Sequence, residues 1–89
     1  MKIRELLIDE TRWIQNIYAI NNDGKSCYVT SKDACKWCLD GALRRCYLLP
    51  QAKEIHKKLW DRIGNYVIWN DSPERTFAEV KALIEELDI

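Results

Sequence analysis

The chain has 89 residues, which is enough for one domain, residues 1–89, and too few for two. Hydrophobic residues make up 47% of it and charged residues 31%, a composition typical of a globular protein and not of a disordered one. Its 14 basic and 14 acidic side chains balance, which disfavours nucleic acid as a partner because phosphate contacts dominate nucleic-acid binding.

The first predicted element is a helix over about residues 2–12. Ile3, Leu6 and Leu7 fall on one face at the i, i+3, i+4 spacing of an amphipathic helix. Acidic residues interrupt this segment too early for a secretory signal peptide. No apolar stretch of the chain approaches the ~20 residues needed to cross a bilayer. We therefore expect a cytoplasmic protein that does not associate with a membrane.

A small β-hairpin is expected next. Four consecutive turn formers, Asn21 to Gly24, separate two short β-prone segments. These segments are residues 17–20 and 26–29, and the pattern predicts that they pair with each other. Because a two-stranded ribbon is marginally stable alone, we expect the hairpin to rest on the helices.

The segment from Thr30 to Cys46 carries the clearest helical pattern. Apolar residues recur at i, i+3, i+4, i+7, i+8 and i+11, which makes one complete helical face: Cys35, Cys38, Leu39, Ala42, Leu43 and Cys46. Thr30 and Asp33 have the spacing of a capping box at the start of this helix. Gly41 is costly inside a helix, so we expect another part of the chain to approach closely there.

The third helix is expected from Pro50 to the Gly64-Asn65 pair. Proline suits a first helical turn, and glycine suits the left-handed residue that ends a helix. His56 lies on the apolar side of this helix, where a lone histidine is usually a satisfied core or boundary residue. The following residues, 66–69, are expected to form a short, buried, extended segment.

The last helix has two possible starts. It begins either at the capping residues Asn70 to Ser72 or, later, at a capping box made by Thr76 and Glu79. With this helix the sequence predicts a mostly α domain of the α+β class. We expect a four-helix single domain with a small β-hairpin between the first and second helices.

Four cysteines are many for a short cytoplasmic chain. Cys27, Cys35 and Cys38, together with His56, are the donors from which a zinc site could be built. A single helix would hold Cys35 and Cys46 about 16 Å apart, which is too far for one tetrahedral ion. Free cysteine is also often a buried apolar residue. We therefore expect no metal and no cofactor, with a cysteine-based zinc or redox protein kept as an alternative.

Trp37 lies on the flank of the second predicted helix, off its apolar stripe. An exposed tryptophan at this place would be a hot spot for a protein partner. Alternatively, the hairpin covers it and it belongs to the core. The chain has four tryptophans and four tyrosines, and this aromatic content favours a protein partner.

A dense polar and aromatic segment precedes the last helix. It contains Trp69, Asn70, Asp71, Arg75 and Thr76. Such a cluster can form a binding site. It can equally cap a helix, with Arg75 paired to Asp71 at i, i+4.

Two stretches, residues 37–43 and 69–80, resemble a family of small uncharacterised proteins. The first stretch carries a C-x-x-GA pattern at Cys38, Gly41 and Ala42. The second carries a WND-x-x-x-RT-x-x-EV pattern, at Trp69, Asn70, Asp71, Arg75, Thr76, Glu79 and Val80. Members of that family occur in bacteriophage genomes and in bacteria, notably actinobacteria. The resemblance implies a phage or bacterial origin and implies no activity.

The sequence thus favours a small cytoplasmic protein-interaction module without catalytic activity. We expect a phage or mobile-element accessory factor that binds a protein partner, for example as an inhibitor of a host protein. The runner-up is a minimal enzyme or small-ligand-binding domain centred on residues 69–76, with His56 or Glu10. The third hypothesis is the zinc or redox protein.

Overall fold

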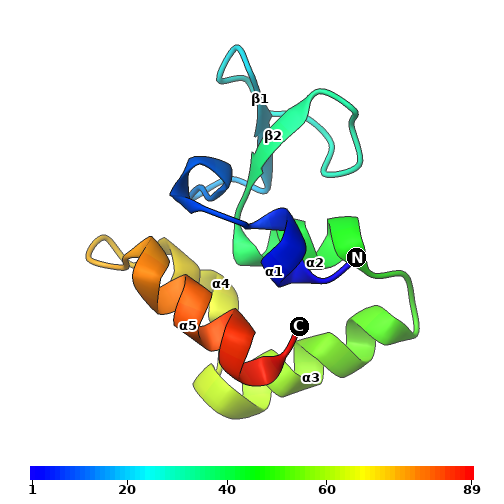
Figure 1. Cartoon of the computed structure of the whole chain (residues 1–89), viewed down its shortest axis with the longest axis vertical. Coiled ribbons are helices and arrows are strands. Elements are labelled where there is room, and N and C mark those ends of the chain that lie inside the picture. The colour runs from blue at the N-terminus through cyan, green and yellow to red at the C-terminus, as the bar shows by residue number, and fades with distance from the viewer.

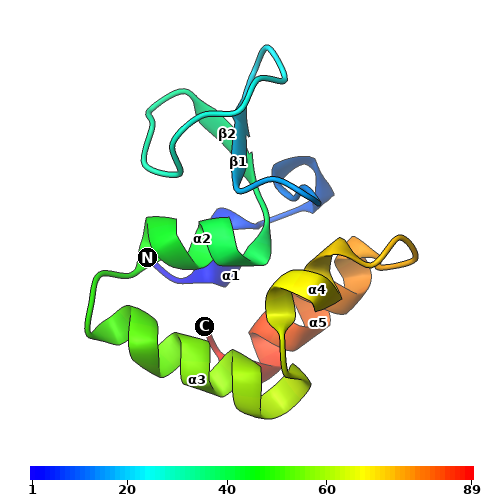
Figure 2. The ribbon, with the colours of Figure 1, turned by 180° about the vertical axis from the view of Figure 1, so that it is seen from behind.

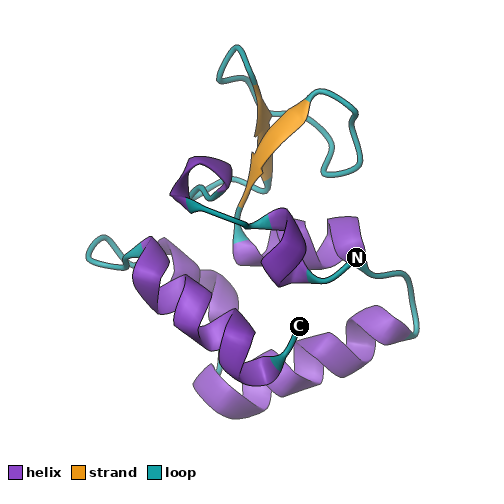
Figure 3. Ribbon diagram, in the orientation of Figure 1, coloured by secondary structure: helices purple, strands orange, loops and turns teal.

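The computed structural model describes all 89 residues. The elements, in chain order, are α1 (Ile3–Leu6), the 3-10 helix η1 (Glu10–Arg12), β1 (Ala19–Asn21), β2 (Ala34–Trp37), α2 (Leu39–Cys46), α3 (Gln51–Ile63), α4 (Tyr66–Asp71) and α5 (Phe77–Leu87). The α-helices gather in one body, and the hairpin of β1 and β2 projects from it (Figures 1 and 3). The fold is therefore α+β as expected, but it has five α-helices and not four.

The expected helix over residues 2–12 is wrong, because the chain leaves the helix after α1. Leu7 closes α1 through its N–H, which donates to the Ile3 carbonyl at 2.8 Å. The Asp9 side chain then accepts from the Thr11 N–H at 2.9 Å and starts the separate turn η1. A side-chain acceptor that competes with the helix in this way favours a new cap over continued helix.

The expected hairpin is present, but its second strand is not residues 26–29. β1 pairs antiparallel with β2, and Ala19 lies opposite Trp37. The turn at residues 21–24 forms as predicted, with Gly24 at a φ of 76°. Beyond that turn, Ser26 makes only an isolated bridge to Ile20. The residues between β1 and β2 therefore form a long loop, where the sequence pattern predicts a strand and the start of a helix.

The second helix is half as long as the pattern indicated. α2 begins at Leu39, and the Sγ atom of Cys38 caps it by accepting from the Gly41 N–H at 3.3 Å. The capping box at Thr30 and Asp33 is wrong, because the Asp33 N–H instead donates to Ser31 Oγ in a local turn. The apolar stripe is real from residue 38 onward, but Cys35 lies on β2.

The expected close approach at Gly41 is confirmed. A Cβ atom at this position would lie 2.0 Å from the carbonyl oxygen of Tyr18, in the segment that leads into β1. The same carbonyl accepts from the Cys38 N–H at 3.3 Å. Glycine therefore lets the hairpin dock directly on the first turn of α2.

The third and last helices agree with the sequence, but the segment between them does not. α3 ends at Gly64, which has a φ of 75°. Residues 66–69 are helical and not extended, because Asn65 Oδ1 caps α4 by accepting from the N–H groups of Val67 and Ile68. α5 starts after Thr76, the later of the two expected positions.

One hydrophobic core lies between the helices and the base of the hairpin. Its fully buried members include Ile3, Leu7, Leu39, Leu59, Val80, Ile84 and Ile89, and they come from both ends of the chain. The termini accordingly lie near each other on the helical body (Figure 1). None of the helices combines the length and the apolar composition needed to cross a membrane.

Candidate functional site

Asn70 lies at the centre of the polar segment of residues 69–76, and its side chain connects α4 to the start of α2 and to the segment after η1. Its side chain is buried, and Oδ1 accepts from the Trp13 indole N–H at 2.7 Å and from the Leu39 N–H at 3.2 Å. Its Nδ2 group donates to the Ile14 carbonyl at 3.3 Å and to Asp71 Oδ1 at 2.8 Å. These four bonds use the full donor and acceptor capacity of the amide.

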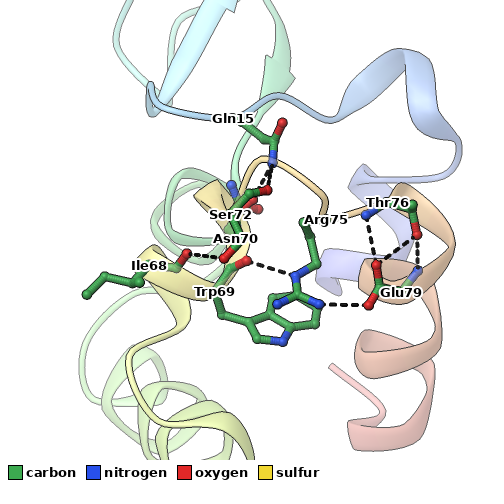
Figure 4. A network of polar contacts seen from close by, with 8 residues as sticks. All are labelled: Gln15, Ile68, Trp69, Asn70, Ser72, Arg75, Thr76 and Glu79. Atoms are coloured by element: carbon green, nitrogen blue, oxygen red, sulfur yellow. Dashed lines mark hydrogen bonds and ion pairs between the residues drawn. The ribbon is translucent and has the colours of Figure 1, made fainter.

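The neighbouring residues add hydrogen bonds to the same connection. Gln15 Nε2 donates to the carbonyls of Asn70 and Ser72 at 2.9 Å and 2.7 Å, as Figure 4 shows. The Asn16 N–H donates to Asp71 Oδ1 at 2.8 Å. We call residues 13–16 and 70–72 the latch, because these bonds hold the segment after η1 against the end of α4.

Arg75 and Thr76 complete the connection to α5. The Arg75 Nε–H donates to the Trp69 carbonyl at 2.8 Å, and its guanidinium carbon lies 4.0 Å from the centre of the Trp69 ring (Figure 4). Arg75 pairs with Glu79 at 2.7 Å and not with Asp71. Thr76 and Glu79 form a reciprocal capping box, and the Thr76 N–H helps to lower the pKa of the Glu79 carboxyl.

The predicted binding residues of this segment are thus brought together, but their polar groups point at the protein itself. Every buried side-chain nitrogen and oxygen in the structure has a hydrogen-bond partner. The geometry is that of helix capping and stacking, which is the structural alternative left open by the sequence. No unpaired group of Asn70 remains for a ligand.

Trp37 is also occupied within the fold. Its side chain is 3% exposed, and its indole N–H donates to the Val29 carbonyl at 3.0 Å. The Arg45 guanidinium lies over the ring, 5.6 Å from its centre, and bonds the Val29 carbonyl as well. The loop between the strands therefore covers Trp37, as the core alternative expected.

The residues of the possible zinc site are not assembled. Cys27, Cys35 and Cys38 are free thiols, and no three His, Cys, Asp or Glu side chains come close enough together to hold a metal ion. Burial raises the pKa of Cys38, and it raises the pKa of Cys46 to about 11. These two thiols keep their protons at neutral pH, and a thiol is a far weaker nucleophile than a thiolate.

His56 lies elsewhere, in an open groove of about 740 Å³ between α2 and α3. Figure 2 shows these two helices side by side, joined at one end by residues 47–50. The groove walls are mostly apolar: Leu43, Tyr47, Leu48, Leu49 and Ala52. Leu48 is 81% exposed and Leu49 is 71% exposed, so the joining segment presents two leucines to solvent.

A polar relay crosses the floor of this groove. Asp40 is 6% exposed, and its Oδ1 accepts from the Tyr66 hydroxyl at 3.3 Å. The same hydroxyl lies 2.9 Å from His56 Nδ1. On the other side of the carboxylate, Arg44 Nε donates to Asp40 Oδ2 at 3.3 Å. A buried carboxylate is thus connected through tyrosine to a histidine at the edge of the groove.

The direction of the relay follows from its proton balance. Burial, followed by the nearby Asp40 carboxylate, raises the pKa of Tyr66, so the hydroxyl keeps its proton. Its one proton goes to Asp40, and its oxygen therefore accepts from the His56 Nδ1–H. The His56 side chain at the end of this chain of hydrogen bonds is exposed.

Sequence reasoning missed the Asp40–Tyr66 half of this site. Asp40 lies on the polar face of the expected helix, and Tyr66 falls in the segment expected to be extended. The i, i+4 spacing of Asp40 and Arg44 was the available signal for their pair. Nothing in the sequence marks the meeting of Asp40 and Tyr66, which lie 26 positions apart.

Comparison with known protein families matches residues 2–87 to the Family of unknown function (DUF6197), and the chain belongs to this family. The membership agrees with the resemblance of the sequence to an uncharacterised family. No curated protein and no solved structure matches the chain.

Proposed function

We propose that this protein is a small protein-interaction module and that the groove between α2 and α3 is its docking surface. The observation that carries the proposal is the pair of exposed leucines, Leu48 and Leu49, at the mouth of an apolar groove. A single exposed leucine is ordinary, but a group of them beside a concave apolar wall marks an interaction site.

The apolar surface continues beyond the groove along α3. His56 stacks on Trp60, with 5.5 Å between the ring centres, and Trp60 is 48% exposed. Ala52, which lines the groove, and Trp60 are eight positions apart on α3, which corresponds to about 12 Å along the helix. A surface of that length suits a peptide segment or a helix of a partner, and tryptophan is enriched among the residues that dominate such contacts.

The proposed cellular role is that of a phage or mobile-element accessory factor that acts in the cytoplasm, for example by inhibiting a host protein. The small size and balanced charge of the chain support this role. The resemblance of residues 69–80 to phage and bacterial proteins supports it as well. Binding through the groove would then occupy a surface of the partner, without any chemical step.

A random library of short peptides, selected on the immobilised protein, tests the docking surface. We expect the selected peptides to lose at least about tenfold in affinity for Leu48→Asp, because a carboxylate replaces an apolar contact at the mouth of the groove. Ile68→Asp is the matched control, since Ile68 is 67% exposed on α4 and does not line the groove. Circular dichroism verifies that both variants fold.

Equal affinity of the selected peptides for the protein, for Leu48→Asp and for Ile68→Asp would contradict the proposal. A selection that yields no binding peptide would contradict it as well.

A further inference from the structure

We infer that the groove takes an acidic, apolar peptide segment, in which a large apolar side chain is flanked by aspartate or glutamate. This inference rests on the proposed function, since it names the chemistry of the partner at the same surface. It follows from the charges around the groove and from the pairing of the chain's own acids.

The charges that face outward from the groove are positive. Arg44 and Lys53 line it, against the single carboxylate of Asp40. Asp40 is buried, and it already accepts from Tyr66 and from Arg44. Its negative charge is therefore compensated inside the protein and is not presented to a partner.

The two cations have capacity left. Lys53 is exposed and forms no ion pair within the chain. Arg44 reaches Asp40 only through Nε, and its side chain is 60% exposed. Its guanidinium carbon also lies 5.1 Å from the centre of the Tyr18 ring, a contact that uses none of the terminal N–H groups in a hydrogen bond, so these groups can still bind a carboxylate.

Each cation follows an apolar wall residue directly in the sequence. Arg44 comes after Leu43 on α2, and Lys53 comes after Ala52 on α3. The apolar walls of the groove therefore carry one positive charge on each helix. A partner side chain such as leucine or phenylalanine would enter the groove while its acidic neighbours meet the two charges. Complementary charges at such positions contribute mainly to specificity and to the rate of association.

A second copy of this chain is a poorer occupant, because its 14 acidic and 14 basic side chains balance and it brings no net negative charge to the groove. Its acidic residues are concentrated near the C-terminal end, where Glu79, Glu86 and Asp88 already form ion pairs within the chain. Arg62 binds Glu86 through two N–H groups, at 2.6 Å and 3.3 Å, which joins α3 to α5. These acids are thus engaged within the chain, whereas others, such as Glu74 and Glu85, form no ion pair, so self-association is included as an outcome of the test below.

The test uses an array of immobilised peptides with leucine, phenylalanine or tryptophan at the centre. Each peptide is made in two forms that differ only in having glutamate or glutamine at the flanking positions. We expect the glutamate forms to bind the full chain at least about tenfold more tightly in low salt. The difference should shrink as the salt concentration rises, because exposed charges are screened.

Two charge-reversal variants on the same helix separate the groove from the overall charge. Lys53→Glu should weaken the glutamate peptides at least about tenfold and leave the glutamine peptides unchanged. Lys58→Glu makes the same change in net charge at a position that does not line the groove, and it should leave both forms unchanged.

The outcomes distinguish this inference from the proposed function. Glutamine and glutamate peptides that bind equally, and that both lose affinity for Leu48→Asp, would overturn the acidic partner and leave the docking groove in place. If no peptide of the array binds in a way that Leu48→Asp weakens, both the acidic partner and the docking groove are overturned. Self-association of the chain that Lys53→Glu abolishes, measured by analytical ultracentrifugation, would show that a second copy is the occupant and would also overturn the inference.

Discussion

The latch and the groove are both built around α2, and they use polar groups in opposite ways. In the latch, the Asn70 amide makes four hydrogen bonds and has no further capacity. In the groove, the Asp40–Tyr66–His56 relay ends at an exposed histidine, and Lys53 has no acidic partner. The polar groups of the latch are used within the protein, whereas those of the groove remain available to a partner.

This difference shows why a dense polar motif is a poor guide to function on its own. The WND-x-x-x-RT-x-x-EV segment is conspicuous in the sequence because many interactions are concentrated there, and those interactions hold the fold. The groove residues come from separate elements and form no motif. The feature of the groove that points to function is the combination of exposed leucines with an exposed lysine, Lys53, that forms no ion pair in the chain.

The largest effect is expected from Gly41→Ala, which would break both regions at once. The added Cβ would lie 2.0 Å from the Tyr18 carbonyl oxygen, so α2 or the hairpin has to move. Because the added methyl group meets backbone atoms, which cannot rotate away as a side chain can, we expect a loss of about 4 kcal/mol in the free energy of unfolding, above the usual cost of overpacking. Urea denaturation measures this loss.

Gly24→Ala is the control for that variant. Gly24 has a φ of 76° but open space around it, so an added methyl meets nothing. The free energy of unfolding should therefore fall by only about 1–2 kcal/mol, which is the cost of placing alanine in this backbone conformation. Equal losses for the two glycines would show that the contact with Tyr18 does not constrain α2.

Asn70→Ala should break the latch and spare the groove. It removes the acceptor of the Trp13 and Leu39 N–H groups and the donor to the Ile14 carbonyl. We expect a loss of about 3 kcal/mol, because buried groups are left without partners. Asn22→Ala, in the exposed turn of the hairpin, should cost less than about 0.5 kcal/mol.

Peptide binding to Asn70→Ala tests whether the groove depends on the latch. At a temperature where Asn70→Ala is folded, groove-binding peptides should retain their affinity. A loss of affinity comparable with that of Leu48→Asp would mean that the latch belongs to the binding site after all.

The sequence predicts the fold well where the determinants are local. α3, its termination at Gly64, and the capping box of Thr76 and Glu79 follow from residues within a few positions of each other. The turn before Gly24 is equally local. The close approach at Gly41 was also predictable, since a glycine inside a helix indicates that something has to fit beside it.

The errors arise where tertiary contacts override a local pattern. The apolar period from Cys35 to Cys46 is helical, yet Cys35 and Trp37 join a strand because β2 pairs with β1 and Trp37 is buried. Residues 66–69 are apolar enough for a strand, but the Asn65 cap and the packing of Tyr66 make them helical. The same long-range contact brings Tyr66 to Asp40.

The smallest effect is expected from Tyr66→Phe, which breaks the relay while keeping the ring in the core. At neutral pH, Asp40 Oδ1 and His56 Nδ1 lose their shared partner, and we expect a loss of about 1–2 kcal/mol in the free energy of unfolding. Groove-binding peptides should also weaken, because the His56 ring is no longer held by its Nδ1 hydrogen bond. A variant that loses stability but no affinity would place the relay with the latch, as a purely structural feature.

Alkaline pH isolates the hydroxyl in the same variant. An unfolded tyrosine titrates near pH 10, whereas burial and Asp40 raise the pKa of Tyr66 in the folded chain. Above about pH 10 the unfolded chain therefore binds fewer protons than the folded one, and stability falls as pH rises. Cys46, with its pKa raised to about 11, contributes a fall of the same sign to both proteins. Urea denaturation from about pH 9 to pH 11 should hence show a shallower fall for Tyr66→Phe, and identical slopes would mean that the Tyr66 proton is not held by the relay.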